Sequence, residues 1–283
     1  MEKWRCKMQQ LYVAELSDNG IEVLHEVSQE ELDELETSYP NFKAFHRMTE
    51  LKDIVIENGM DFKEWMQKDN IEKCYFNHIS TEKLVQTSNK LAFNFGTSIG
   101  TFLDIESNLL KKYRPGAEIK LKTLESSFYN DNVEYRFWIR FRNYVVHYGF
   151  PYTGLEADEA NGIQIVCKRD HLLEFEKWNQ VKNDIKKMDE NVNLSAMVEK
   201  MNVLVYALYM NFYTYFAEEI GNATIKFGEF CKKHGTQNPV IVKAEDLRKM
   251  KGICVLPLPK KELFQALKML KENPNVKVES IKI

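Results

Sequence analysis

The sequence predicts a mainly α-helical protein, with a small β-hairpin region at its N-terminal end and a small α/β appendage at its C-terminal end. Residues 81–113 and 132–148 carry strong helical patterns, whereas short alternating apolar runs lie near both ends. Of the 283 residues 44% are hydrophobic, which is enough to bury a full core. We expect three parts, at residues 1–79, 80–235 and 236–283.

The composition indicates a soluble cytoplasmic protein. Its five cysteines lie far apart without a C-x-x-C pair, so we expect reduced thiols, no disulfide and no metal site. The first residues lack the apolar core of a signal peptide. Residues 201–217 are uncharged, but their asparagines and tyrosines and the charged residues at both ends favour a buried helix over a membrane span.

The N-terminal part begins with a predicted β-hairpin. In residues 10–27, apolar residues alternate on both sides of Ser17-Asp18-Asn19-Gly20, and an Asn-Gly pair between such runs is typical of a hairpin turn. The acidic stretch that follows, residues 29–37, has Leu32 and Leu35 between its carboxylates. It predicts a helix with one solvated face, not a metal cluster.

Residues 81–113 carry the longest helical pattern, which Arg114-Pro115-Gly116 ends. Beside its apolar stripe runs a row of small residues, Gly96 and Gly100, which continues to Asp104 and Ser107. Each glycine in a helix interior costs ~1 kcal/mol relative to alanine, so two of them suggest a packing reason. We expect a second helix to approach this row closely.

Residues 132–148 form the second strong helix, which opens at the candidate caps Asp131 and Asn132 and ends at Gly149 and Pro151. At 100° per residue the helix has an aromatic face and a polar face. The predicted core face holds Phe137, Phe141, Tyr144, Val145 and Tyr148, and the opposite face holds Arg136, Arg140, Asn143 and His147.

Residues 142–147, with the sequence RNYVVH, combine a permanent cation with a near-neutral base. The guanidinium of Arg142 can neutralise charge on a phosphoryl group, whereas the imidazole of His147 is a base that can accept a hydroxyl proton at cellular pH. Asn143, four residues before His147, could orient the imidazole or bind a phosphate oxygen. Phosphodiester cleavage needs such groups.

The run from Tyr135 to Pro151 resembles the Arg-x4-His signature of HEPN domains, many of which are metal-independent ribonucleases. The resemblance covers about residues 80–235. It implies a helical bundle, a homodimer, no cofactor, and RNA such as transfer RNA as the substrate. It further implies a toxin or antiviral-defence role with an antitoxin or other regulatory partner. By this resemblance, His147 assists attack by a 2′-hydroxyl and Arg142 stabilises the resulting charge, leaving a 2′,3′-cyclic phosphate.

Helix geometry separates the two motif residues. Arg142 and His147 lie ~140° apart around an ideal helix and ~7.5 Å apart along it, and Arg140 shares the face of His147 better. Two solutions remain open. The family resemblance implies that His147 of one copy works beside Arg142 of the other; alternatively, the last helical turn before Gly149 is distorted.

Glu106 falls within the apolar stripe of residues 81–113, where an unpaired carboxylate would be costly. We expect Glu106 or Asp104 to pair with an arginine of the motif helix. The alternative for Glu106 is an edge position from which the carboxylate reaches water. His147 and the arginines also have a structural explanation, because cations near a helix C-terminus are stabilised by its dipole.

The competing function is a non-catalytic module that binds a nucleotide, RNA or a protein partner. The net charge of −3 and the pI of about 6.1 favour it, since nucleic acid would have to meet a local basic patch. The sequence contains no phosphate-binding loop and no H-E-x-x-H motif that would indicate another chemistry.

The spacing of apolar residues predicts the remaining helices and strands. They are a strand or extended linker at 163–167, helices at 170–187, 194–219, 221–234 and 260–271, and short apolar runs at 240–242, 253–257 and 276–278.

Overall fold

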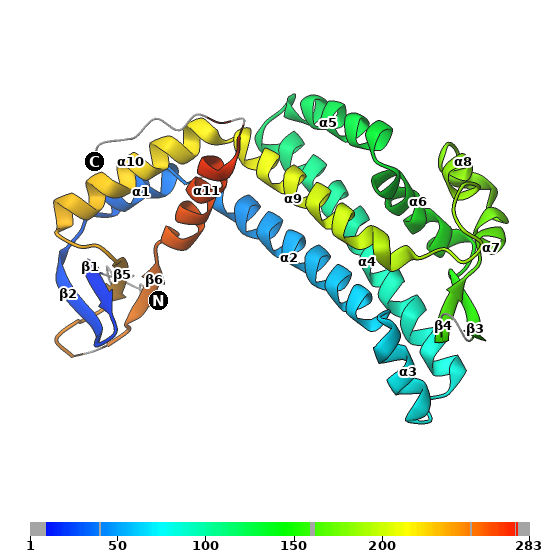
Figure 1. Ribbon diagram of the computed structural model, residues 1–283. Coiled ribbons are helices and arrows are strands. Elements are labelled where there is room, and N and C mark those ends of the chain that lie inside the picture. Colours follow the sequence, from blue (N-terminus) through cyan, green and yellow to red (C-terminus); the bar gives the residue numbers. More distant parts are fainter. Residues whose placement is uncertain (1–9, 40, 159–161, 250, 275, 277–283) are drawn as a thin grey trace, which may run out of the picture. The chain divides into compact units, whose positions relative to one another are not determined.

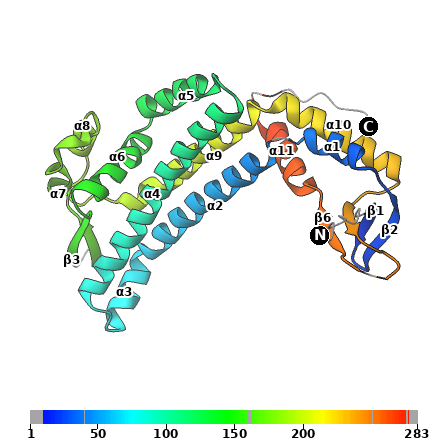
Figure 2. The same ribbon diagram turned by 180° about the vertical axis from the view of Figure 1, so that it is seen from behind.

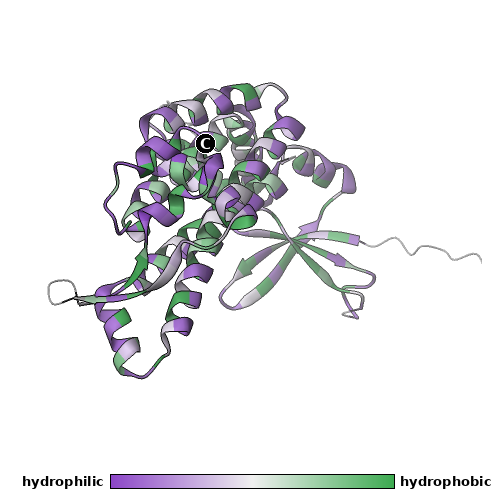
Figure 3. Cartoon of the chain, turned by 90° about the vertical axis from the view of Figure 1, so that its right-hand side faces the viewer, coloured by the Kyte–Doolittle hydropathy of each residue, from purple (hydrophilic) through white to green (hydrophobic). Residues whose placement is uncertain are grey.

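The computed structural model describes residues 10–39, 41–158, 162–249, 251–274 and 276 (Figure 1). The chain forms two compact units, one of residues 47–212 and the other of the segments on either side of them. The protein is mainly helical, as predicted, and Figure 3 shows apolar and polar residues alternating around its helices.

The unit of residues 47–212 consists of long helices and one small hairpin. The two helices that the sequence predicts most strongly, 81–113 and 132–148, are confirmed as α4 and α6. In chain order the elements are most of α2 (Phe42–Trp65), α3 (Lys68–Phe76), α4 (Thr81–Tyr113), α5 (Ala117–Asp131), α6 (Val133–His147), β3 (Tyr152–Asp158), β4 (Gly162–Cys167), α7 (Arg169–Leu173), a 3₁₀ turn at Glu176–Trp178, α8 (Val181–Ile185), a second at Leu194–Met197, and most of α9 (Val198–Thr214).

The small-residue row of α4 faces α6, which confirms the expected close helix approach (Figures 1 and 2). A Cβ atom built on Gly96 would lie 2.6 Å from Cδ1 of Phe141, and one built on Gly100 would lie 2.6 Å from Cδ of Arg142. Both distances are far below van der Waals contact. The two glycines therefore allow the side chains of α6 to lie directly on the backbone of α4.

The buried face of α6 is aromatic. The ring of Trp138 lies 4.7 Å from that of Phe95 on α4, and Phe137 and Tyr144 stack on Trp178, each with ring centroids 5.3 Å apart. Such pairs add ~0.5–1.5 kcal/mol to the stabilisation from burial alone. The predicted core face is correct except at Tyr148, which is 44% exposed because the helix ends before it.

The predicted helix 170–187 is wrong. The segment forms α7, a 3₁₀ turn and α8, and Asn179 between the last two has a positive φ of 57°. The break accompanies the burial of Trp178, whose indole is fully buried and stacks on Phe137 of α6, so tertiary packing overrides the helical pattern. The predicted strand 163–167 is confirmed as β4, whose antiparallel partner β3 the sequence analysis missed.

The uncharged segment 201–217 lies mostly in α9, with Met201, Val205 and Leu208 fully buried. This agrees with the predicted core helix. Among the described helices, none has the length and apolar content to cross a membrane.

The second unit holds a four-stranded antiparallel sheet with the strand order β2-β1-β5-β6. The predicted hairpin and the acidic helix 29–37, with Leu32 and Leu35 buried, are confirmed. Helix α10 packs against both α1 and α11. The elements are β1 (Gln10–Ser17), β2 (Gly20–Glu26), α1 (Gln29–Thr37), α10 (Ala217–His234), β5 (Pro239–Ala244), β6 (Cys254–Pro257) and α11 (Lys260–Glu272).

The predicted division at residues 79/80 and 235/236 needs correction. Strand β1 pairs with both β2 and β5, so the N-terminal hairpin and the C-terminal segment form one sheet. They are not the two separate parts of the protein that the sequence predicts. Cross-strand pairs such as Val13 with Ile241 bury the apolar sides of both segments together. The predicted break at 219–221 also moves, because α9 ends at Thr214 and α10 begins at Ala217. The predicted run 276–278 falls largely outside the described residues.

Gly96→Ala should destabilise the protein by ~1–3 kcal/mol, because its methyl group would overlap the buried ring of Phe141. Gly100→Ala is the matched comparison. The methyl group that this substitution adds would meet the flexible side chain of Arg142, which can move aside. The better helix propensity of alanine, worth ~1 kcal/mol, should offset the cost of that contact. Urea denaturation of both variants measures the difference, and equal losses would contradict this packing.

Candidate functional site

Arg142 extends across the backbone of α4 and ends on a carboxylate. Its side chain passes over Gly100, and Nη1 donates a hydrogen bond to Oδ2 of Asp104 at 2.7 Å. This is the expected pairing of an acidic residue of α4 with an arginine of the motif helix, and Asp104 provides it. Both side chains remain partly in water, 42% and 64% exposed, so the ion pair is worth only ~0–1 kcal/mol and an anion could compete for the guanidinium.

Asn143 and His147 are exposed on α6. The helix is α-helical up to His147, and the N–H of Tyr148 continues the pattern by donating to the carbonyl of Tyr144 at 2.9 Å. The helix is therefore regular from Arg142 to His147 and leaves helical geometry only at Tyr148, so a distortion does not explain how the two side chains could meet. In one copy, helix geometry directs their side chains to different sides.

Arg136 and Arg140 have different surroundings from Arg142. Arg136 donates to both oxygens of Asp184 at 2.9 and 3.2 Å and to the carbonyls of Tyr129 and Asn130 at 2.8 Å each, so it joins α6 to α8 and to the end of α5. The hydrogen bond to Asp184 raises the pKa of Arg136. The Nε atom of Arg140 is buried and has no hydrogen-bond partner among the described residues.

Glu106 neither pairs with a motif arginine nor reaches water. Its side chain is fully buried, and neither carboxyl oxygen has a hydrogen-bond partner in the part of the chain that the structure describes. Burial, reinforced by the nearby Glu125, raises the pKa of Glu106 well above its ordinary value. Burial therefore favours the neutral, protonated form of this carboxyl group, since that form is far cheaper to bury than the carboxylate.

Two further groups adjoin Glu106. Burial raises the pKa of Glu125, on α5, and Asp104 raises it further, although Lys122 opposes the shift. The hydroxyl of Tyr135 is also buried without a hydrogen-bond partner among the described residues. Asp104, Glu125 and Glu106 on α4 and α5 are thus neighbouring carboxyl groups, of which Asp104 is exposed and Glu106 is buried.

The segment after His147 is held by residues that the sequence analysis did not select. Nε2 of His171 lies 3.1 Å from the carbonyl oxygen of Phe150, and its Nδ1 lies 3.4 Å from the carboxylate of Glu174, which also accepts a hydrogen bond from the hydroxyl of Tyr148. In the sequence His171 stood alone. The turn through β3 and β4 brings it back to the end of α6, which no local pattern indicated.

Comparisons with protein-family models, curated proteins and solved structures found no match for this chain.

Glu106→Gln should stabilise the protein increasingly as pH rises. Because folding raises the pKa of Glu106, its favourable contribution is complete below the ordinary value of 4.5 and is lost as pH rises toward the folded pKa. The neutral glutamine should match the wild type near about pH 4 and then gain up to ~1.4 kcal/mol per pH unit. Urea denaturation across pH measures this gain, with the exposed Glu176→Gln as control. A pH-independent difference would contradict a buried titrating carboxyl.

Proposed function

We propose that this protein is a HEPN-like, metal-independent endoribonuclease whose site is assembled from two copies of the chain. The observation that supports it best is the placement of Arg142, whose guanidinium lies over Gly100 and is held at the surface by Asp104. A partly solvated guanidinium at this position is suited to bidentate binding of a phosphate. Asn143, the next residue, is exposed beside it.

In the proposed reaction, His147 removes the proton of a ribose 2′-hydroxyl. The 2′-oxygen then forms a bond to the adjacent phosphorus, and the bond from phosphorus to the 5′-oxygen breaks. The leaving oxygen takes up a proton, so the products are a 2′,3′-cyclic phosphate and a 5′-hydroxyl. Arg142 stabilises the charge that grows on the phosphoryl oxygens, and Asp104 acts as a positioning residue through Arg142.

The two-copy arrangement is supported by the regular helix from Arg142 to His147 and by two exposed apolar side chains near the motif. Val146 lies inside the motif and is 56% exposed, and Phe150 just beyond it is 51% exposed. In a monomer these exposed apolar side chains have no role beside polar catalytic groups. A second copy of the chain would bury them. In this arrangement Arg142 of one copy and His147 of the other face the same phosphate.

The proposed cellular role is that of a toxin or antiviral-defence effector acting on RNA such as transfer RNA, restrained by an antitoxin or other regulatory partner. This role rests on the family resemblance of residues 135–151. The second candidate is a non-catalytic binding module. It is favoured by the engagement of Arg142 with Asp104, which leaves the guanidinium partly neutralised before any RNA arrives.

The wild-type protein should cut total RNA and transfer RNA in EDTA and leave cyclic-phosphate ends. Removing the base in His147→Ala should slow cleavage ~10²–10⁴-fold. Removing the cation in Arg142→Ala should slow it ~10²–10³-fold. Gel analysis with end-group determination measures both effects.

His78→Asn is the histidine control. His78 is exposed and has a positive φ of 63°, which asparagine tolerates. Intact RNA with the wild type, at unchanged melting temperatures of all variants, would favour the binding module.

Mixing the inactive variants Arg142→Ala and His147→Ala should restore activity if the site spans two copies. Random exchange makes half of the dimers mixed, and each mixed dimer has one intact site, so about a quarter of the wild-type rate should return. A site within one chain predicts no recovery. Co-expression with two affinity tags and purification of the mixed dimer provides the control that exchange has occurred.

A further inference from the structure

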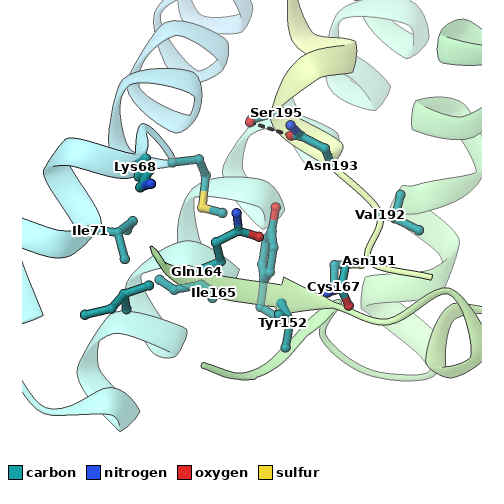
Figure 4. Close-up of a pocket in the computed structure, with 13 residues that line it drawn as sticks. Lys68, Ile71, Tyr152, Gln164, Ile165, Cys167, Asn191, Val192, Asn193 and Ser195 are labelled. Carbon is teal, nitrogen blue, oxygen red and sulfur yellow. Dashed lines mark hydrogen bonds between the residues drawn. The ribbon is translucent and has the colours of Figure 1, made fainter. Parts of the chain in front are cut away.

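A cavity of about 250 Å³ lies between the start of α3, the β3–β4 hairpin and the segment before α9 (Figure 4). It is smaller than the ~300–1,000 Å³ of sites for drug-sized ligands, which suits a molecule of about one ring. Its walls include Lys68 and Ile71 of α3, Ile165 of β4, and Asn193 and Ser195 of the later segment. None of these residues belongs to the Arg142 and His147 site.

Lys68 carries the only charge among the described residues that line the cavity, and none of them is acidic. Its ammonium lies 3.9 Å from the carboxylate of Glu72, and its side chain is 50% exposed, so the ion pair is loose. Lys68 is also the first residue of α3, whose N-cap residue Gln67 makes no capping hydrogen bond with its side chain. The helix N-terminus adds partial positive charge at the same wall.

Tyr152 places a second donor at the cavity. Tyr152 is only 3% exposed, and its hydroxyl has no hydrogen-bond partner among the described residues. Figure 4 shows the hydroxyl pointing toward Asn193 and Ser195. A buried hydroxyl without a partner costs ~1–3 kcal/mol, a cost that a bound acceptor would remove. Burial raises the pKa of Tyr152 well above its ordinary value, so the group is a neutral donor.

The neighbouring groups are held firmly. Asn89 of α4 accepts from the N–H of Tyr152 at 2.9 Å and donates to its carbonyl at 2.8 Å, which fixes this wall to the helix. Oδ1 of Asn193 accepts from the hydroxyl of Ser195 at 2.8 Å and from the N–H of Ala196 at 3.1 Å. The amide of Asn193 is thereby oriented, and its Nδ2 group donates to no residue that the structure describes. A prearranged site loses less free energy on binding.

We propose that this cavity binds a small organic anion with an apolar body. Its carboxylate or phosphate group accepts hydrogen bonds from Lys68, Asn193 and Tyr152, and its apolar ring packs against Ile71 and Ile165. Donors on Lys68, Asn193 and Tyr152, without a carboxylate among the described lining residues, suit an acceptor group and disfavour a cation.

Thermal unfolding of the full chain tests this site with benzoate and benzyl phosphate as anionic probes and benzamide as the neutral match of benzoate. At least one anion should raise the unfolding midpoint with increasing concentration, and benzamide should not. Lys68→Met should weaken binding of that anion ~10-fold or more. Lys73→Met, at an exposed position on the same helix, is the control and should bind as the wild type does.

Tyr152→Phe separates a ligand site from a merely structural cavity. Without a probe, this variant should melt higher than the wild type, because it lacks the unpaired buried hydroxyl, yet it should gain less from the anion. Stabilisation that is equal for benzoate and benzamide, no effect of either anion, or an undiminished effect in Lys68→Met would each overturn the proposal.

Discussion

The approach of α6 to α4 is the constraint on which the candidate site depends. Gly96 lets the ring of Phe141 lie on the backbone of α4, and one turn later Gly100 does the same for the side chain of Arg142. Asp104, one further turn along, then receives the guanidinium. One row of a single helix therefore combines packing with the placement of a charged group. A larger side chain at Gly96 would meet the buried ring of Phe141, whereas one at Gly100 would displace the flexible side chain of Arg142.

Behind this surface the same helices bury polar groups at a cost to stability. Glu106 is fully enclosed, and the hydroxyl of Tyr135 has no hydrogen-bond partner among the described residues. Burial and the nearby Asp104 raise the pKa of Glu125, and burial and the nearby Glu125 raise the pKa of Glu106.

Local signals predicted the parts of the fold that local forces determine. Helix α4 was predicted with its observed bounds because Arg114 and Gly116 end it, and its glycine row indicated the packing of α6. The pairing of β1 with β5 was missed because it joins distant segments, and the break at Asn179 was missed because it accompanies packing of Trp178 on the distant residue Phe137. The Asp104 pairing was anticipated from charge and spacing. The enclosure of Glu106 was not, since it depends on how α5 covers α4.

The proposed chemistry depends on whether two copies of α6 meet at Val146. Sedimentation equilibrium of the wild type and of Val146→Glu measures this most directly, since the substitution places a carboxylate in the apolar surface without altering the buried face of the helix. We predict a dimer for the wild type and a monomer of unchanged melting temperature for the variant. A wild-type monomer at concentrations where RNA is cut would contradict the two-copy site.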